Sequence, residues 1–149
     1  MKQDKNNPGT PLMKQYLDVK NQHPGSIVLF RMGDFFETFN EDAKITANIL
    51  GIVLTKRANG AASEVPLAGF PHHALDNYLP RLVKAGHRVA ICEQVEDPKL
   101  AKGIVKRKVI EVVTPGTITA DQALNEKSNS YIVSVFTHHD NSGYAVLDQ

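Results

Sequence analysis

The spacing of apolar and polar residues along the chain predicts three helices. In the first and third stretches apolar side chains recur every three or four positions, as they do on one face of a helix. In the second, Glu41 and Asp42 lie in the first turn, where acidic residues match the positive end of the helix dipole. Capping residues and chain breakers bound each stretch. In the third stretch Pro80 lacks a backbone N–H, so we expect that helix to kink or break. The helices are expected from Thr10-Pro11 to Pro24-Gly25, from the N-cap Asn40 to Gly51, and from His72 to Ala85.

Shorter runs rich in β-branched and aromatic residues predict strands between these helices. The run at 27–32 is apolar on both faces, which is typical of a strand covered from above and below. Residues 56–64 are small and polar and predict a mobile surface loop. Further strands are expected at 35–39, 52–55, 88–95 and 104–113, followed by a hairpin of 131–137 with 144–148 around the turn signal at 141–143.

Helix and strand signals alternate, but some neighbouring strands are joined by tight turns. This order predicts an α/β (α+β) fold, a mixed β-sheet flanked by about three helices. An isolated hairpin is marginally stable in water, so we expect the last one to come from a truncated second domain. The expected organisation is a flexible N-terminal arm at 1–9, one domain at 10–117, a linker with a short helix at 118–130, and the start of a second domain at 131–149.

Composition narrows the classes of function. Of the 149 residues, 42% are hydrophobic and 22% charged, with no apolar run long enough for a bilayer and no basic leader, so a soluble intracellular protein without a membrane partner is expected. A formal charge of +1 attracts a polyanion weakly, so any nucleic-acid contact must be local. The motifs of P-loop ATPases, dinucleotide-binding folds, zinc proteases and triad hydrolases are absent from the sequence.

The chain's cysteine and histidines give weak signals for chemistry. Cys92 lies among apolar residues without an adjacent cation and is expected to be a buried core residue. The pairs His72-His73 and His138-His139 have no carboxylate or thiol at ligand spacing. We therefore expect no metal site, no cofactor site and no catalytic residue.

The segment Gly33-Asp34-Phe35-Phe36-Glu37 is the strongest candidate for a binding site. In an extended backbone, residues two apart share a face, so Phe35 and Glu37 would project together while Phe36 points to the core. Composition alone favours a different interpretation, in which all the phenylalanines of this segment are buried and Glu37 is solvated. From the residues alone, both interpretations stay open.

A longer series of motifs resembles a known family. LFRMGDFFETF is followed by LTKR, then by VPLAGFPHHALDNYLPRLVKAGHRVAICEQVEDP, then by VTPGT. In this order the motifs closely resemble the N-terminal mismatch-recognition domain (domain I) of MutS-type DNA mismatch repair proteins, from about Thr10 to Thr117. The hairpin from Tyr131 resembles the start of that family's connector domain.

The resemblance implies a non-enzymatic module that binds mismatched double-stranded DNA. Phe35 would be a wedge that enters the minor groove and stacks on a mispaired or unpaired base, and Glu37 would hydrogen-bond that base. Supporting contacts are expected from Met32, Gly33, Lys56 and Arg57. For a full-length parent the resemblance implies ATP and Mg, a homodimer, and a bacterial cytoplasmic, DNA-associated location.

Two other classes of function remain as alternatives. One is a small α/β enzyme that uses Asp34 and Glu37 as an acid/base pair beside His72 or His73. The other is a protein-interaction domain that docks an exposed phenylalanine in a groove. The basic cluster of Lys102, Lys106, Arg107 and Lys108 is either a solvated strand face, which we favour, or a DNA contact, and Arg31 could pair internally with an acidic residue.

Overall fold

The computed structural model describes residues 9–60, 64–117, 131–139 and 141–148. Their helices are α1 (Pro11–Gln22), α2 (Asn40–Leu50), the short 3₁₀ helix η1 (His72–Ala74) and α3 (Leu75–Lys84). The strands are β1 (Ser26–Met32), β2 (Phe35–Phe39), β3 (Thr55–Ala58), β4 (Glu64–Pro71), β5 (Arg88–Gln94), β6 (Arg107–Val113), β7 (Tyr131–His138) and β8 (Asn141–Asp148). None of the helices in these ranges is long and apolar enough to cross a membrane.

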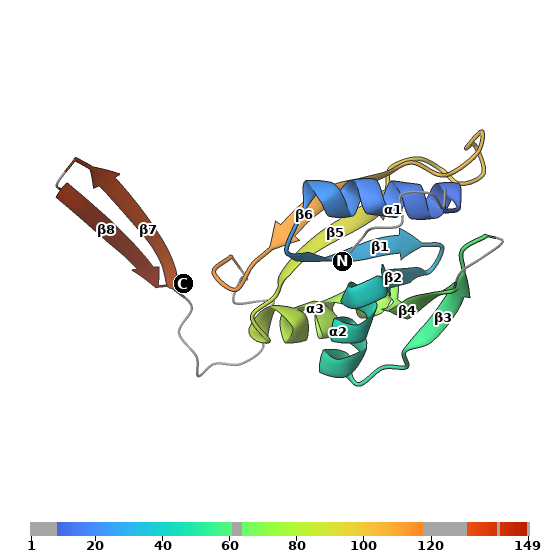
Figure 1. Cartoon of the computed structure of the whole chain (residues 1–149), viewed down its shortest axis with the longest axis horizontal. Coiled ribbons are helices and arrows are strands. Elements are labelled where there is room, and N and C mark those ends of the chain that lie inside the picture. Colours follow the sequence, from blue (N-terminus) through green and yellow to red (C-terminus); the bar gives the residue numbers. More distant parts are fainter. Residues whose placement is uncertain (1–8, 61–63, 118–130, 140, 149) are drawn as a thin grey trace.

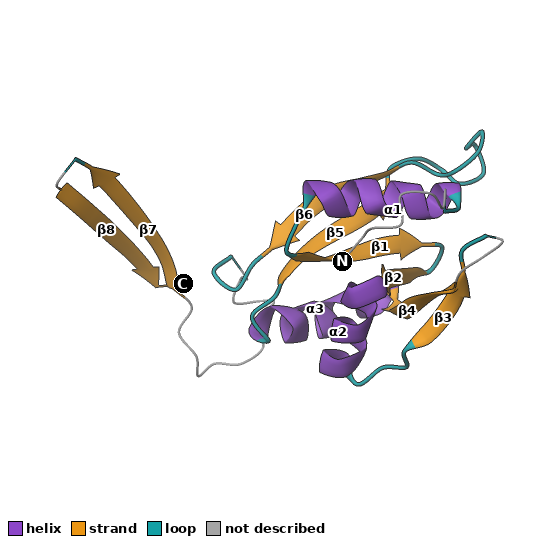
Figure 2. Cartoon of the chain, viewed as in Figure 1, coloured by secondary structure: helices purple, strands orange, loops and turns teal. Residues whose placement is uncertain are grey.

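Six strands form a mixed sheet in the order β3-β4-β2-β1-β5-β6, and β7 and β8 form a separate antiparallel pair. Within the larger sheet β1 and β5 run parallel, and the other neighbours are antiparallel. Helix α1 lies on one face, and α2 and α3 lie on the other (Figure 1). Figure 2 shows this layering as orange strands between purple helices. The predicted fold class, a mixed sheet with about three helices and a hairpin, is confirmed.

Strand β1 is buried on both faces, as its apolar sequence predicts. Ile27 and Leu29 pack into the core under α3, whereas Val28 and Phe30 pack into the core under α1. The alternation follows from the opposite directions of successive side chains in a strand. From Ile27 to Phe30 the strand is therefore packed on both faces, and it is a rigid base for the turn that follows it.

Helix α1 begins as its sequence predicts. Pro11 is its first residue, and the hydroxyl of Thr10 accepts a hydrogen bond from the backbone N–H of Met13 at 3.4 Å. Tyr16, on its buried face, donates from its hydroxyl to the carboxylate of Asp42 in α2 at 3.1 Å. That carboxylate also accepts from the ammonium of Lys20 at 2.7 Å and from the backbone N–H of Val28 at 3.0 Å, so one buried group joins α1, α2 and β1.

The N-cap predicted for α2 is wrong, while the glycine predicted to end the helix is confirmed. Asn40 is the first residue of α2 rather than its N-cap, and no side chain caps the helix at Phe39. Strand β2 passes into α2 without a loop, and Asn40 accommodates the change of direction with a φ of +54°, a conformation that asparagine tolerates. Gly51 ends the helix with a φ of +67°.

The interpretation of residues 52–64 is wrong in two places. Residues 52–54 belong to no strand, and the segment predicted as a loop begins with β3, which contains Lys56 and Arg57. Residues 55–58 pair with 64–67 of β4. Because β3 is an edge strand, charged side chains are compatible with it, and local composition did not reveal its partner.

Pro80 does not break α3, which is continuous from Leu75 to Lys84, so the expectation of a break is wrong. Pro80 is buried together with Leu79, Leu82 and Val83. One missing hydrogen bond is compatible with the helix because its neighbours pack against the sheet.

The strands β5 and β6 match the sequence prediction, although β6 begins at Arg107 rather than at residue 104. The C-terminal hairpin is also confirmed, but its turn is not at 141–143. Asn141, Ser142 and Gly143 lie within β8, opposite 138, 137 and 136 of β7. Residues 1–8 of the predicted arm and the whole predicted linker helix lie outside the described residues.

Candidate nucleic-acid interface

The candidate site is built on the turn between β1 and β2. Met32 pairs with Phe35 across this turn, which leaves Gly33 and Asp34 as its two central residues. Gly33 has a φ of +54°, a conformation that a residue with a Cβ rarely adopts. Such a two-residue turn requires glycine first and matches the twist of the strands that it joins. The turn therefore fixes which face of β2 each following side chain occupies.

The two phenylalanines after the turn point to opposite faces. Phe35 is 46% exposed, whereas Phe36 is 1% exposed and packs near Phe70, with ring centroids 6.2 Å apart. Phe39 is also buried. The alternation predicted from the sequence is confirmed, and the interpretation that buries every phenylalanine of the segment is wrong. An aromatic ring thus stands open to solvent beside a tight turn.

Glu37 shares the face of Phe35 but is not freely solvated. Its side chain is 17% exposed, and its carboxylate accepts a hydrogen bond from the guanidinium of Arg57 at 3.0 Å. Burial raises the pKa of the Glu37 carboxyl, while the positive charges of Arg57 and Arg107 oppose that rise. The carboxylate is therefore held in place and is easier to protonate than an ordinary glutamate.

The structure separates the two cations predicted to act together. Arg57 reaches Glu37, but Lys56 projects to the opposite face of β3, because successive side chains alternate in a strand. Lys56 forms an exposed ion pair with Glu64 at 3.1 Å. Of the predicted binding residues, Met32, Gly33, Phe35, Glu37 and Arg57 gather around the end of β1 and β2, and Lys56 does not.

Arg31 fulfils its expected internal role. Its guanidinium lies 3.0 Å from the carboxylate of Glu93 in β5 and 5.7 Å from the centroid of the Phe36 ring. These contacts join the end of β1 to β5 on the face opposite to Phe35. Arg31 thus stabilises the strand that carries the turn.

Sequence reasoning missed Arg107. The sequence places it in a basic cluster with three lysines, but its guanidinium is half-buried and lies 4.9 Å from the centroid of the Phe30 ring. It also contacts the sulfur of Met32 at 3.5 Å. In the sequence, Arg107 alternates in step with Val105 and Val109, whereas Lys106 and Lys108 occupy the positions between them. A period-two reading of this strand could therefore have placed Arg107 on the apolar face, and residues 105, 107 and 109 are indeed partly buried.

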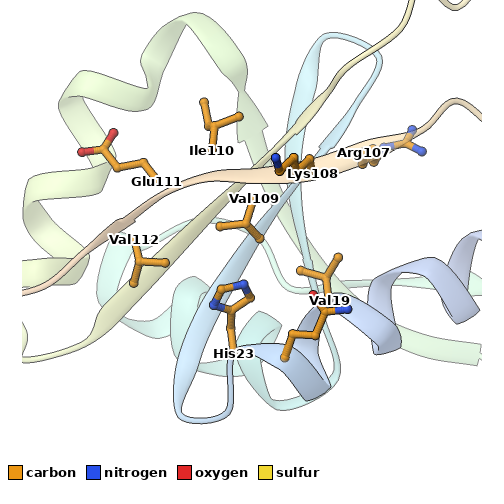
Figure 3. A pocket seen from close by; sticks show the side chains of 9 residues that line it. Val19, His23, Arg107, Lys108, Val109, Ile110, Glu111 and Val112 are labelled. Atoms are coloured by element: carbon orange, nitrogen blue, oxygen red, sulfur yellow. The ribbon is translucent and has the colours of Figure 1, made fainter.

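A groove of about 420 Å³ lies elsewhere, between the end of α1 and β6. Figure 3 shows Val109 and Val112 directed toward His23, with Ile110 directed away. The acid/base pair of the enzyme alternative does not line this groove: Asp34 lies in the exposed turn, and Glu37 is paired with Arg57. His72, the histidine of that alternative, lies beside the turn with its Nδ1 3.1 Å from the backbone carbonyl of Asp34, a contact that involves no carboxylate.

Cys92 is buried, as predicted, and burial raises the pKa of its thiol to about 11. At neutral pH it is therefore a protonated core residue rather than a nucleophile. Within the described ranges no three histidine, cysteine or acidic side chains are grouped closely enough to hold a metal ion.

Comparison with known proteins identifies relatives. Residues 10–122 match the family model described as MutS domain I. The chain is 58% identical over 139 residues to the DNA mismatch repair protein MutS of Parabacteroides distasonis and to that of Porphyromonas gingivalis. It is 57% identical over 136 residues to the protein of the same name from Cytophaga hutchinsonii. These alignments cover 91–93% of the chain but only 16% of each relative.

Proposed function

Because the chain belongs to the MutS domain I family, we propose that it is a DNA-recognition module that binds mispaired or unpaired bases in duplex DNA. The observation that carries the proposal is the exposure of Phe35 beside a tight turn, while its neighbour Phe36 is buried. In this proposal Phe35 enters the minor groove as a wedge and Glu37 hydrogen-bonds the base on which the ring stacks.

Insertion of an aromatic wedge should be more favourable at a mismatched base step than at a matched one. Separating two stacked base pairs costs a few kcal/mol, and stacking a base on an aromatic ring returns about 1–3 kcal/mol. On intact DNA the two contributions roughly cancel. A mismatch has already lost pairing energy and stiffness, so the same insertion of Phe35 becomes favourable there.

Glu37 adds discrimination against paired DNA. A carboxylate brought near phosphates is repelled, and on a matched duplex the imino N–H groups are already occupied in base pairs. At a mismatch it can accept an imino proton or, when protonated, donate to a purine ring nitrogen. Its raised pKa supports the second option, and the ion pair with Arg57 supports the first by holding the charged carboxylate in place.

The proposed supporting contacts differ in kind. A Cβ built on Gly33 would meet no atom within 4 Å, so DNA could approach the backbone of the turn closely there. Met32, opposite Phe35, would contact sugars beside the wedge. Lys56 and Arg57 would meet the phosphate backbone, although Lys56 would do so from the other face of β3 and after exchanging Glu64 for a phosphate.

The test is a fluorescence titration of labelled duplexes with and without one mismatch. We expect the wild-type chain to prefer the mismatched duplex, and Phe35→Ala to lose roughly five- to hundredfold in mismatch affinity, the equivalent of about 1–3 kcal/mol of stacking. Phe35→Tyr keeps an aromatic ring and serves as the matched control. Equal affinity of the wild type for both duplexes would reject the proposal, and retained mismatch preference in Phe35→Ala would reject the wedge.

The proposal extends to a longer protein, because the chain spans only 16% of the relatives it matches. There we propose a homodimer, DNA-associated in the cytoplasm, in which the β7–β8 hairpin begins a connector domain and other regions bind ATP and Mg. In this division of roles the present chain binds DNA and catalyses nothing.

A further inference from the structure

Arg107 links parts of the fold that are not neighbours in the sheet. It lies in the edge strand β6, which pairs with β5, yet its Nε donates a hydrogen bond to the backbone carbonyl of Arg31 in β1 at 2.6 Å. Arg31 directly precedes Met32, the residue that pairs with Phe35 across the turn. The side chain of an edge strand therefore reaches the end of the strand that presents the candidate wedge.

The register of the sheet explains why the carbonyl of Arg31 needs this donor. Met32 and Phe35 flank a two-residue turn and form its hydrogen-bonded pair, so the backbone groups of Arg31 face away from β2 and toward β5. The ladder between β1 and β5 ends one residue earlier, at Phe30 and Cys92. The two strands separate there, and the guanidinium of Arg107 takes the place of the missing ladder donor.

The remaining atoms of the guanidinium are also occupied. One terminal nitrogen donates to the side-chain oxygen of Gln15 in α1 and to the carbonyl of Val105, both at 2.9 Å. The other contacts the sulfur of Met32, and the group lies against the ring of Phe30. A planar group with several fixed donors suits this arrangement, and a lysine could satisfy only part of it.

We propose that Arg107 is a positioning residue for the wedge. By joining β6, α1 and the end of β1, its guanidinium fixes Arg31 and Met32 and thereby the turn that directs Phe35 outward. Arg107 acts through these residues and needs no contact with DNA. The part of this inference that concerns mismatch preference rests on the proposed function, whereas the ordering of the turn does not.

The variant Arg107→Lys keeps the charge but removes the planar donor set. We expect the backbone amides of Met32 and Phe35, the pair that closes the turn, to exchange with solvent about tenfold faster, as expected for losing a hydrogen bond to a charged group. The ratio of matched to mismatched Kd should fall several-fold, with an unchanged salt dependence because the charge is retained. Arg88→Lys, at the exposed start of β5, is the matched control and should change neither quantity.

Gln15→Ala provides a milder variant in case Arg107→Lys folds poorly. It removes one partner of the guanidinium and should increase exchange at the turn in the same direction but to a smaller extent. Hydrogen exchange followed by NMR gives this readout without DNA.

Each outcome decides the proposal. Wild-type exchange at Met32 and Phe35 in both variants overturns it. So does an equal loss of affinity for both duplexes in Arg107→Lys without faster exchange, because that result assigns Arg107 to a phosphate contact. Faster exchange at the turn supports positioning even if the wild type shows no mismatch preference, in which case the proposed function fails and the structural role of Arg107 stands.

Discussion

Replacing each of two adjacent phenylalanines by alanine should have very different effects on stability. Phe36 is 1% exposed and belongs to the core under α3, so Phe36→Ala should lower the free energy of unfolding by about 3–5 kcal/mol through lost burial and a cavity. Phe35 is 46% exposed. Fully burying a phenylalanine contributes about 1.5–3 kcal/mol, so removing a half-exposed ring should cost roughly 1 kcal/mol.

Urea unfolding followed by circular dichroism measures this difference. The midpoint should shift strongly for Phe36→Ala and slightly for Phe35→Ala, with similar slopes for both variants and the wild type. A loss of stability in Phe35→Ala as large as that in Phe36→Ala would refute the reasoning, because it would mean that the Phe35 ring is part of the core.

Two further predictions concern acidic side chains. Because burial raises the folded-state pKa of Glu37, its contribution to stability is present at pH values below its unfolded pKa and is lost as the pH rises through the folded-state pKa. The stability of Glu37→Gln relative to the wild type should therefore increase from pH 4 toward neutrality in urea titrations, and a pH-independent difference would contradict this. Asp42→Ala removes the buried carboxylate that Lys20, Tyr16 and the backbone N–H of Val28 share, and it should cost about 3–5 kcal/mol at neutral pH. The exposed neighbour Glu41 tolerates alanine, and equal effects of the two changes would contradict the buried role of Asp42.

The sequence predicted features that depend on local pattern. The opposite directions of Phe35 and Phe36 follow from a tight turn and the period of a strand, and both could be read from five residues. The same holds for the cap at Thr10 and the stop at Gly51, where one residue type satisfies one local requirement. The turn and the alternation after it were sufficient to locate the centre of the candidate site from the sequence.

Features that depend on distant partners escaped prediction. Residues 55–58 resemble a loop in composition and become a strand only because β4 pairs with them. From its local sequence Arg107 resembles a solvated cation. Its role depends on where β1 and β5 separate, near Met32, which lies 75 residues before Arg107 in the sequence. A proline disfavours a helix locally, but α3 accommodates Pro80 because the proline and its neighbours are buried. In each case tertiary contacts outweighed the local preference.

The most direct test of the proposed recognition is to follow the base itself. A duplex carrying 2-aminopurine beside a single mismatch changes fluorescence when the neighbouring base step opens. We predict that saturating wild-type chain changes this fluorescence on the mismatched but not on the matched duplex, and that the Phe35→Ala variant at saturation leaves it unchanged. The same fluorescence change with Phe35→Ala would contradict insertion of the Phe35 ring.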